Sequence, residues 1–308
     1  PYRPQRHSLN LLALGDGLAP VRCGVVRPCD ADSLSGAMEA ARLGLIDPVL
    51  IGPETRLRDL ANANGIDLTG ITIEHVPHSH AAAATAAAMA ADRRVHALMK
   101  GSLHTDELIR AVVAETTLRT ARRMSHVFRF DVPTYAKPLL LTDSALNIRP
   151  TLAEKADIVQ NAILFAQIMG IALPKVAILS AVETINPAIP STLDAAALCK
   201  MAQRGQITGG LVDGPLAFDN AISPHAASIK QIASDVAGDA DILVVPDLES
   251  GNMLGKQLQY LGGATLAGIV LGAQVPIALT SRADGASARV ASALLTKLVA
   301  HHNRTVRP

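Results

Sequence analysis

The chain has 308 residues and a mass of 32.1 kDa, a size at which a single hydrophobic core stops growing, so two domains are predicted. Lysine and arginine total 28 against 27 aspartate and glutamate residues, a balance that gives no basic surface for nucleic acid or an anionic membrane. Aromatic residues make up only 2%, too few for a base-stacking platform. The three cysteines form no metal-like pair and are typical of a reducing cytosol, so we expect a cytoplasmic protein.

Strand-like and helix-like segments alternate through the first half of the chain. The predicted strands are short apolar runs at residues 22–26, 48–51, 71–74 and 95–99. The predicted helices, of which the last is rich in alanine, lie at 32–43, 54–63 and 79–94. Strands and helices at this spacing indicate βαβ units and therefore a parallel sheet.

The second half of the chain continues this alternation. After a predicted strand at 139–141, Thr151 and Glu154 form a capping-box pattern that predicts a helix ending near Gly170. Further strands are predicted at 176–180, 207–212, 242–245, 266–271 and 276–280. Further helices are predicted from Asp194, after Asn220, after Gly251 and over 285–300. The uncharged stretch 260–281 contains glycines and a proline, and it is interpreted as two buried strands around a turn, not as a membrane span.

We therefore predict an α/β protein of two α/β/α lobes with mainly parallel sheets and an interlobe cleft. The first lobe is assigned to residues 1–148, in which 1–20 read as a linker-like segment. The C-terminal helix of 281–308 is expected to join this first lobe, and the second lobe is assigned to 149–280. Neither lobe contains a Walker-type glycine-rich loop or a GxGxxG pattern, which disfavours a P-loop or a standard dinucleotide fold.

Residues just after predicted strands are the candidates for a site, because open parallel sheets bind ligands where their strands end. Lys100 and Gly101 directly follow one such strand. Gly101 permits a ligand to approach the backbone closely, and Lys100 supplies positive charge. An ordinary strand-to-helix turn with a surface lysine is an equally good interpretation of these two residues.

A run of arginines follows the next predicted helix, at Arg119, Arg122 and Arg123. Guanidinium groups bind phosphate or carboxylate in bidentate fashion, so the run is a candidate anion site. Composition alone favours the alternative, a solvated face with salt bridges. Ser125 and His126 come next, and on a strand they would point to opposite faces, which argues against a catalytic Ser–His pair.

The last candidate is the stretch Thr280-Ser281-Arg282-Ala283-Asp284. Ser281 and Asp284 match the S-x-x-D pattern of a helix start. A serine hydroxyl followed by arginine at a helix N-terminus is also a compact anion site, and the sequence leaves both interpretations open. The segment 247–252 has the composition of a plain turn or helix start.

Taken together, several segments resemble the phosphate acetyl/butyryltransferase family. They are KGSLHTDELIR, LRTARRMSHVF, AKPLLLTDSALNIRPTLAEKADI, VDGPLAFDNAIS, VVPDLESGNMLGKQLQYLGGA and VPIALTSRADG, and they occur in the family's order over roughly residues 95–290. The resemblance implies reversible exchange of an acetyl or butyryl group between coenzyme A and inorganic phosphate, with acetyl phosphate or butyryl phosphate as the other partner. It also implies no metal, no cofactor beyond coenzyme A as a substrate, and a homodimer.

The resemblance also implies roles for individual residues. Ser281 would donate a hydrogen bond to the oxyanion that develops when a coenzyme A thiolate attacks the acyl carbonyl, and Arg282 would hold the phosphate. Arg110 and Arg119 match the family's other anion-binding arginines. Further residues expected to line the same cleft are Lys100, Ser125, Asp247, Gly251 and Asn252.

One departure from the family pattern affects the thiol base. The acetyltransferases place an acidic residue seven positions after the serine, where this chain has Ala288, so Asp284 is the remaining candidate for a catalytic acid or base. The missing acid also leaves open a non-catalytic, acyl-CoA-sensing regulatory domain of the same fold. A metal- and NAD-dependent dehydrogenase of related fold is a third hypothesis, for which the sequence shows no acidic cluster. Residues 1–20 resemble the linker after an enoyl-CoA hydratase-like domain in fused family members, which predicts a longer full-length protein.

Overall fold

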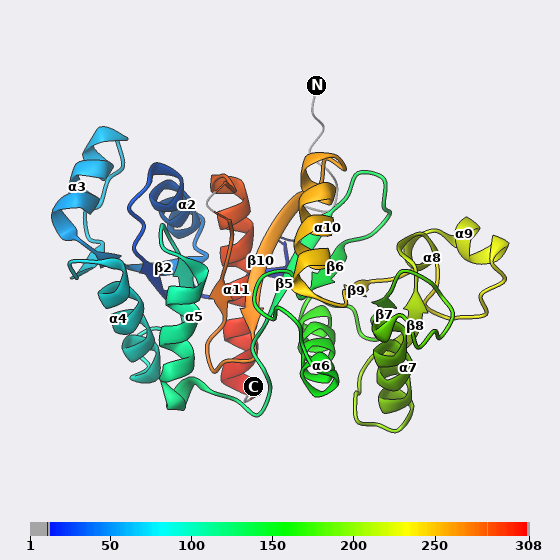
Figure 1. Ribbon diagram of the computed structural model, residues 1–308. Helices are drawn as coiled ribbons and strands as arrows, with labels where there is room; N and C mark the ends of the chain where they lie inside the picture. Colours follow the sequence, from blue (N-terminus) through cyan, green and yellow to red (C-terminus); the bar gives the residue numbers. More distant parts are fainter. Residues whose placement is uncertain (1–10, 12, 282, 307–308) are drawn as a thin grey trace. The chain divides into compact units, whose positions relative to one another are not determined.

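The computed structural model describes residues 11–306 except 12 and 282 (Figure 1). Its described part divides into two compact units, an N-terminal unit of residues 11–121 and 267–306 and a central unit of residues 122–266. Residues 122–148, which the sequence analysis placed in the first lobe, group with the central unit. Within the described residues, no helix is long and apolar enough to cross a membrane.

The sheet of the N-terminal unit has the strand order β3-β2-β1-β4-β11-β10. Its strands are β1 (Val21–Val26), β2 (Ile46–Gly52), β3 (Thr72–His75), β4 (Ala97–Lys100), β10 (Thr265–Leu271) and β11 (Ile277–Ala278). Neighbouring strands are parallel except for β10 and β11, which are antiparallel. The carboxyl ends of β1, β4 and β11 therefore lie at one edge of the sheet, where ligands bind in such folds.

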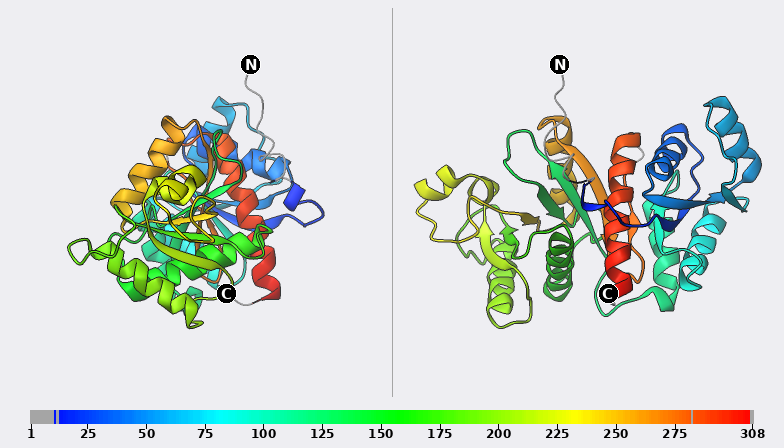
Figure 2. Two further views of the ribbon diagram at one scale, coloured as in Figure 1. Left: turned by 90° about the vertical axis from the view of Figure 1, so that its right-hand side faces the viewer. Right: turned by 180° about the vertical axis from the view of Figure 1, so that it is seen from behind.

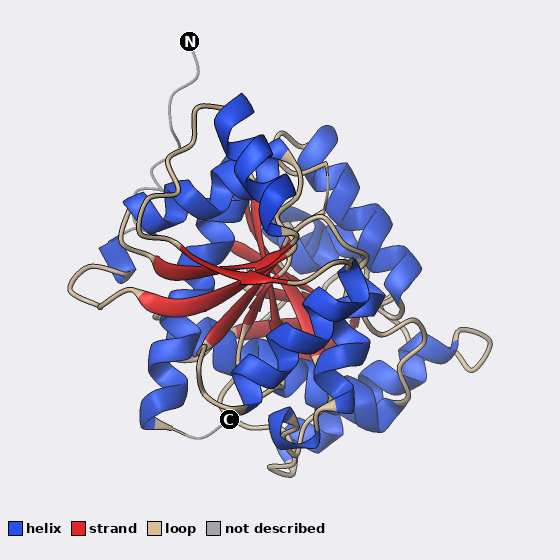
Figure 3. Ribbon diagram, turned by 90° about the vertical axis from the view of Figure 1, so that its left-hand side faces the viewer, coloured by secondary structure: helices blue, strands red, loops and turns tan. Residues whose placement is uncertain are grey.

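Helices cover both faces of this sheet (Figure 3). They are α2 (Ala31–Arg42), α3 (Glu54–Ala63), α4 (Ser79–Ala91), α5 (Thr105–Ala114), the 3₁₀ turn η1 (Thr116–Leu118) and α11 (Ala286–Thr305). The view from behind shows α11 beside α2, with which it is in contact (Figure 2). Helices α4 and α5 contact each other in the same way. The alanine-rich α4 buries Ala82 and Ala86 completely and contacts β1 and β2, because small side chains allow a helix to approach a sheet closely.

The central unit contains a second sheet segment with the strand order β5-β6-β9-β7-β8. Its strands are β5 (Ser125–Asp131), β6 (Leu139–Thr142), β7 (Lys175–Leu179), β8 (Leu211–Leu216) and β9 (Ile242–Val244). Its helices are α6 (Leu152–Ile168), α7 (Pro190–Gln203), α8 (Phe218–Ile222), α9 (Pro224–Ile229) and α10 (Leu248–Tyr260). The β5–β6 pair is antiparallel, and the other pairs are parallel.

The mainly parallel α/β fold predicted from the sequence is confirmed, and local signals account for much of it. The capping box of Thr151 and Glu154 opens α6, with the Glu154 carboxylate accepting the Thr151 amide at 2.8 Å. The uncharged stretch 260–281 holds the two short buried strands β10 and β11. Several boundaries differ from the prediction. β8 begins at Leu211 instead of residue 207, and α10 begins at Leu248 instead of after Gly251. α7 begins at Pro190 instead of Asp194, and α8 begins at Phe218 instead of after Asn220.

Candidate functional site

The loop that follows β4 is held against the loop that follows β1. The amide of Gly101 donates to the Val26 carbonyl at 2.9 Å, and the amide of Ser102 donates to the Arg27 carbonyl at 2.8 Å. The Arg27 guanidinium donates in return to the Ser102 carbonyl at 2.8 Å. A Cβ on Gly101 would lie 2.5 Å from both the Val26 and the Arg27 carbonyl oxygens, so this crossing requires glycine.

Lys100 is the last residue of β4, directly before this crossing. The residue is 4% exposed, and its ammonium group donates to the Gly101 carbonyl at 3.4 Å. Such a buried lysine differs from the ordinary surface lysine that was one of the two interpretations from the sequence. A charged group held at the carboxyl end of a strand is a feature of an anion site, because the low local dielectric strengthens its field.

The segment that follows β11 forms a tight turn closed by Asp284. The Asp284 carboxylate accepts the Ser281 amide at 2.7 Å, and the Asp284 amide donates to the Ser281 carbonyl at 3.1 Å. The Ser281 hydroxyl oxygen accepts the Ala283 amide at 3.3 Å. Ser281 is half-buried and Asp284 is 1% exposed. The predicted pairing of Ser281 with Asp284 is thus present, but it does not itself start the helix. α11 begins at Ala286 after an extended Gly285, within one residue of the start predicted for it. Arg282 lies outside the described residues.

Arg289, in the first turns of α11, links the two segments. Its guanidinium donates to the Lys100 carbonyl at 3.4 Å and to the Ser281 carbonyl at 3.5 Å. The residue is only 2% exposed. Lys100, Gly101, Ser281, Asp284 and Arg289 are called the Lys100–Ser281 cluster below. The sequence analysis did not identify Arg289, because a single arginine in a helical pattern carries no local signal of burial.

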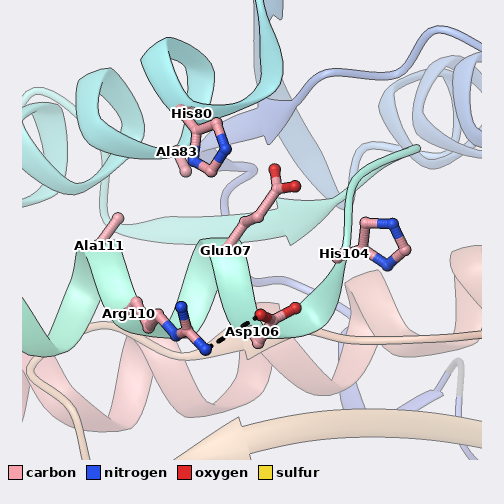
Figure 4. Close-up of a pocket in the computed structure, with 7 residues that line it drawn as sticks. All are labelled: His80, Ala83, His104, Asp106, Glu107, Arg110 and Ala111. Carbon is pink, nitrogen blue, oxygen red and sulfur yellow. Dashed lines mark ion pairs between the residues drawn. The ribbon is translucent and has the colours of Figure 1, made fainter.

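Arg110 lies on α5 and lines an open cavity of about 630 Å³ between the first turns of α4 and α5 (Figure 4). Its side chain is 83% exposed and pairs with Asp106 at 3.5 Å. The other residues lining this cavity are His80, Ala83, His104, Glu107 and Ala111. One Glu107 carboxylate oxygen is buried without a hydrogen-bond partner among the described residues, whereas the exposed Arg110 guanidinium is accessible to a ligand in the cavity.

The arginine run after α5 divides into different environments. Arg119 is exposed, and its Nε donates to the Val113 carbonyl at 2.9 Å. Arg123 pairs with Glu154 at 2.9 Å and donates to Asn147 at 2.9 Å. Residues 119–124 form no helix, and Arg123 forms a salt bridge of the kind expected for a solvated face.

In the central unit, the segment 247–252 opens α10 and is not a loop. Asp247 is the N-cap, and its carboxylate accepts the Ser250 amide at 2.8 Å. Burial alone raises the pKa of Asp247, but the hydrogen bonds from Ser250 and the nearby Lys155 charge lower it overall. A Cβ on Gly251 would lie 2.7 Å from the Asp143 carbonyl oxygen, so glycine lets the helix start sit against the loop after β6.

Two more predicted site residues belong to the central unit. Asn252 is exposed, and its amide donates to the Ser144 carbonyl at 3.5 Å. The Ser144 hydroxyl is buried without a hydrogen-bond partner among the described residues, and it lies 3.0 Å from where a Gly251 Cβ would be. Ser125 is fully buried, and its hydroxyl accepts from Asn161 of α6 at 2.9 Å, so within this unit it serves packing. As predicted, His126 faces the other side of β5, where its ring lies 4.3 Å from that of Phe128.

Two of the histidines accept hydrogen bonds at helix starts, and two of the cysteines are buried enough to raise their pKa. His75 accepts the Glu54 amide at the start of α3, and His78 accepts the Ala81 amide at the start of α4. Within the part of the chain that the structure describes, no group of histidine, cysteine and acidic residues could hold a metal ion. Burial raises the pKa of Cys23, and that of Cys199 to about 12, so these thiols are poor nucleophiles.

Comparisons with known proteins assign the sequence and the fold to one family. The sequence profile described as phosphate acetyl/butaryl transferase matches residues 69–297. A phosphate acetyltransferase of Rickettsia felis is 57% identical over 301 residues, covering 97% of this chain and 86% of the relative. A phosphate butyryltransferase of Clostridium acetobutylicum is 41% identical over 272 residues, covering 88% of this chain and 90% of the relative. The crystal structure of a branched-chain phosphotransacylase from Enterococcus faecalis V583 matches with a TM-score of 0.79 and 30% identity, covering 91% of this chain and 99% of that one.

Proposed function

We propose that this chain, which belongs to the phosphate acetyl/butaryl transferase family, exchanges a short acyl group between coenzyme A and inorganic phosphate at the Lys100–Ser281 cluster. It is an acyltransferase, as its relatives are. The observation that carries the location is the Arg289 guanidinium, which hydrogen-bonds the backbone of both Lys100 and Ser281. Two of the residues singled out from the sequence thereby lie close together at the carboxyl ends of neighbouring strands, which supports one site there.

The reaction needs a nucleophile, an oxyanion donor and a cation. In the direction of acyl-CoA formation, the thiolate of coenzyme A attacks the carbonyl carbon of an acyl phosphate. A C–S bond forms, the bond from the acyl carbon to the phosphate oxygen breaks, and phosphate leaves with that electron pair. Negative charge grows on the carbonyl oxygen during the attack, so a hydrogen-bond donor fixed at that point lowers the barrier.

The Ser281 hydroxyl is the donor for this oxygen. The Ser281 amide is already committed to the Asp284 carboxylate, so it does not stabilise an oxyanion. The hydroxyl oxygen accepts the Ala283 amide, which leaves the hydroxyl proton for the substrate. Asp284 thus orients Ser281 through its amide, and this positioning role is better supported by its 1% exposure than the role of thiol base.

Lys100 supplies positive charge to the phosphate end of the substrate. Its ammonium group is held at the carboxyl end of β4 in surroundings that expose only 4% of the residue, where its field is weakly screened. We retain Arg282 as a phosphate-binding residue by its place next to Ser281 in the chain. The substrate is a short-chain acyl group, because relatives of this chain carry both acetyltransferase and butyryltransferase names.

The test is a coupled assay of acyl-CoA formation from acyl phosphate and coenzyme A, and of the arsenate-dependent reverse reaction. The wild-type protein is expected to turn over acetyl-, propionyl- or butyryl-CoA. Ser281→Ala is expected to lower kcat by about 10²–10³-fold, the usual cost of one oxyanion donor. Its free energy of unfolding should fall by no more than about 1 kcal/mol, because one local hydrogen bond is lost.

Ser223→Ala is the matched control. Ser223 accepts the Ala226 amide at 3.2 Å in the same way, at the start of α9. This variant should lose the same stability and keep wild-type kcat. Turnover of Ser281→Ala equal to wild type would overturn the assignment of the hydroxyl. Binding of acetyl-CoA by the wild type without any turnover would favour a sensing role. That role is the second candidate because Ala288 stands where the acetyltransferases have an acidic residue.

A further inference from the structure

The buried arginine of α11 stands out because the proposed chemistry does not use it. Arg289 is among the largest fully buried side chains of the described residues. Its Nε has no hydrogen-bond partner among them. Burying a cation with an unsatisfied N–H group lowers the stability of the fold. A buried group that lowers stability calls for an explanation. The two hydrogen bonds from Arg289 to backbone carbonyls indicate a role in holding those two segments.

We propose that Arg289 is a positioning residue, whose guanidinium sets the distance between the loop of Lys100 and the turn of Ser281. This inference rests on the proposed function of those two residues. The Lys100 and Ser281 carbonyls follow two strands that are direct neighbours, since Ala278 of β11 pairs with Met99 of β4. One planar group with several fixed donors can hold both carbonyls at once, which a lysine ammonium on a flexible stem does less well.

Each of the two segments is otherwise held by contacts of its own. The turn of Ser281 is closed from within by Asp284. The loop after Lys100 is held by the chain at Val26 and Arg27. Arg289 therefore adds what these local contacts do not supply, a tether from the oxyanion donor to the cation. Misplacing reacting groups by about 0.5 Å is enough to reduce catalysis, so such a tether acts on turnover more than on binding.

A glycine on α2 makes room for this arginine. A Cβ on Gly36 would lie 2.8 Å from both Cβ and Cδ of Arg289, well inside ordinary contact distance. Gly36 is an interior residue of α2, where glycine is unfavourable relative to alanine, so its absence of a side chain has a packing reason. Gly36 also offers a remote way to displace Arg289 without changing its charge or either loop.

The test uses the full chain and compares Arg289→Met, Arg289→Lys and Gly36→Ala with Ser292→Ala. Ser292 is the control because it is fully buried on the same helix and donates to the Ala288 carbonyl at 2.7 Å, without contacting either loop. Arg289→Met and Gly36→Ala are expected to lower kcat by about 10–100-fold while the KM for coenzyme A changes by less than about threefold. Arg289→Lys should recover part of that loss, and Ser292→Ala should keep wild-type kcat even if it unfolds earlier.

Amide hydrogen exchange supplies a readout that does not depend on turnover. Arg289→Met should raise exchange in residues 100–103, 281 and 283–285 relative to Ser292→Ala. Unchanged exchange in both segments, or a wild-type kcat in Arg289→Met, would overturn the inference. A wild type that turns over no acyl-CoA would overturn the proposed function instead, and faster exchange in Arg289→Met would then still support the tether.

Discussion

Replacing Gly101 by alanine tests whether the crossing behind Lys100 is as tight as the structure indicates. The added Cβ would lie 2.5 Å from two backbone carbonyl oxygens, and an ordinary contact begins at 3.4 Å, so the two loops would have to separate by about 0.9 Å. Those oxygens belong to the backbone and are themselves hydrogen-bonded across the crossing, so no side-chain rotation relieves the clash.

The magnitude follows from what this separation disrupts. It weakens the two backbone hydrogen bonds from Gly101 and Ser102, each worth about 0.5–1.5 kcal/mol net. Overpacking strain adds about 1–3 kcal/mol. Gly101→Ala should therefore lower the free energy of unfolding by about 2–6 kcal/mol. Because Lys100 moves with the loop, the fraction that remains folded should also lose turnover.

Urea unfolding followed by circular dichroism measures the first effect, and acyl-CoA formation per folded molecule measures the second. Gly255→Ala, inside α10, is the matched control, because its added Cβ would lie 3.5 Å from the Leu141 and Phe130 side chains, an ordinary van der Waals distance. Alanine there should stabilise the protein by about 0.5–1 kcal/mol. A Gly101→Ala variant that unfolds within about 0.5 kcal/mol of wild type and keeps its turnover would refute the reasoning.

Two further predictions concern exposed charges. Arg110→Ala should raise the KM for coenzyme A about tenfold, because a guanidinium that can bind an anion is removed. Stability should not change, because the side chain is 83% exposed and only loosely paired with Asp106. A wild-type KM in initial-rate kinetics would contradict this. Hydrogen bonds from Lys137 and Lys175 lower the pKa of Asp239, so its contribution to stability is present above about pH 4 and is lost as the pH falls through the lowered value. Wild type should therefore be more stable than Asp239→Asn at pH 7, by less than about 1 kcal/mol because the aspartate is half exposed. Urea titrations should show this difference shrinking toward pH 3.

Features encoded by neighbouring residues could be predicted from the sequence. The Thr151–Glu154 capping box and the pairing of Ser281 with Asp284 each span three residues, so their pattern is visible in the chain. The helix-start interpretation of Ser281 and Asp284 is wrong for an equally local reason, although the start predicted for the helix, near residue 285, is confirmed within one residue. Asp284 folds back onto the Ser281 amide and closes a separate turn, so the helix begins only after the extended Gly285.

Features that depend on distant residues could not be predicted. The burial of Arg289 depends on Gly36, on the carbonyl of Lys100 and on the placement of β11 beside β4. No pattern of spacing in the sequence predicts that these residues lie together. The same holds for the hydrogen bond that Ser125, expected from the family resemblance to line the cleft, accepts from Asn161 on another element.

The way the chain passes through the two units has a consequence for its synthesis. Residues 122–266 are inserted between two parts of the N-terminal unit, which is completed only by β11 and α11. On a translating ribosome, β4 cannot pair with β11, nor α2 pack against α11, until residues 277–305 have emerged. All strands and helices of the inserted unit, in contrast, are synthesised before β11 and α11. We therefore expect this unit to acquire protease resistance first during translation.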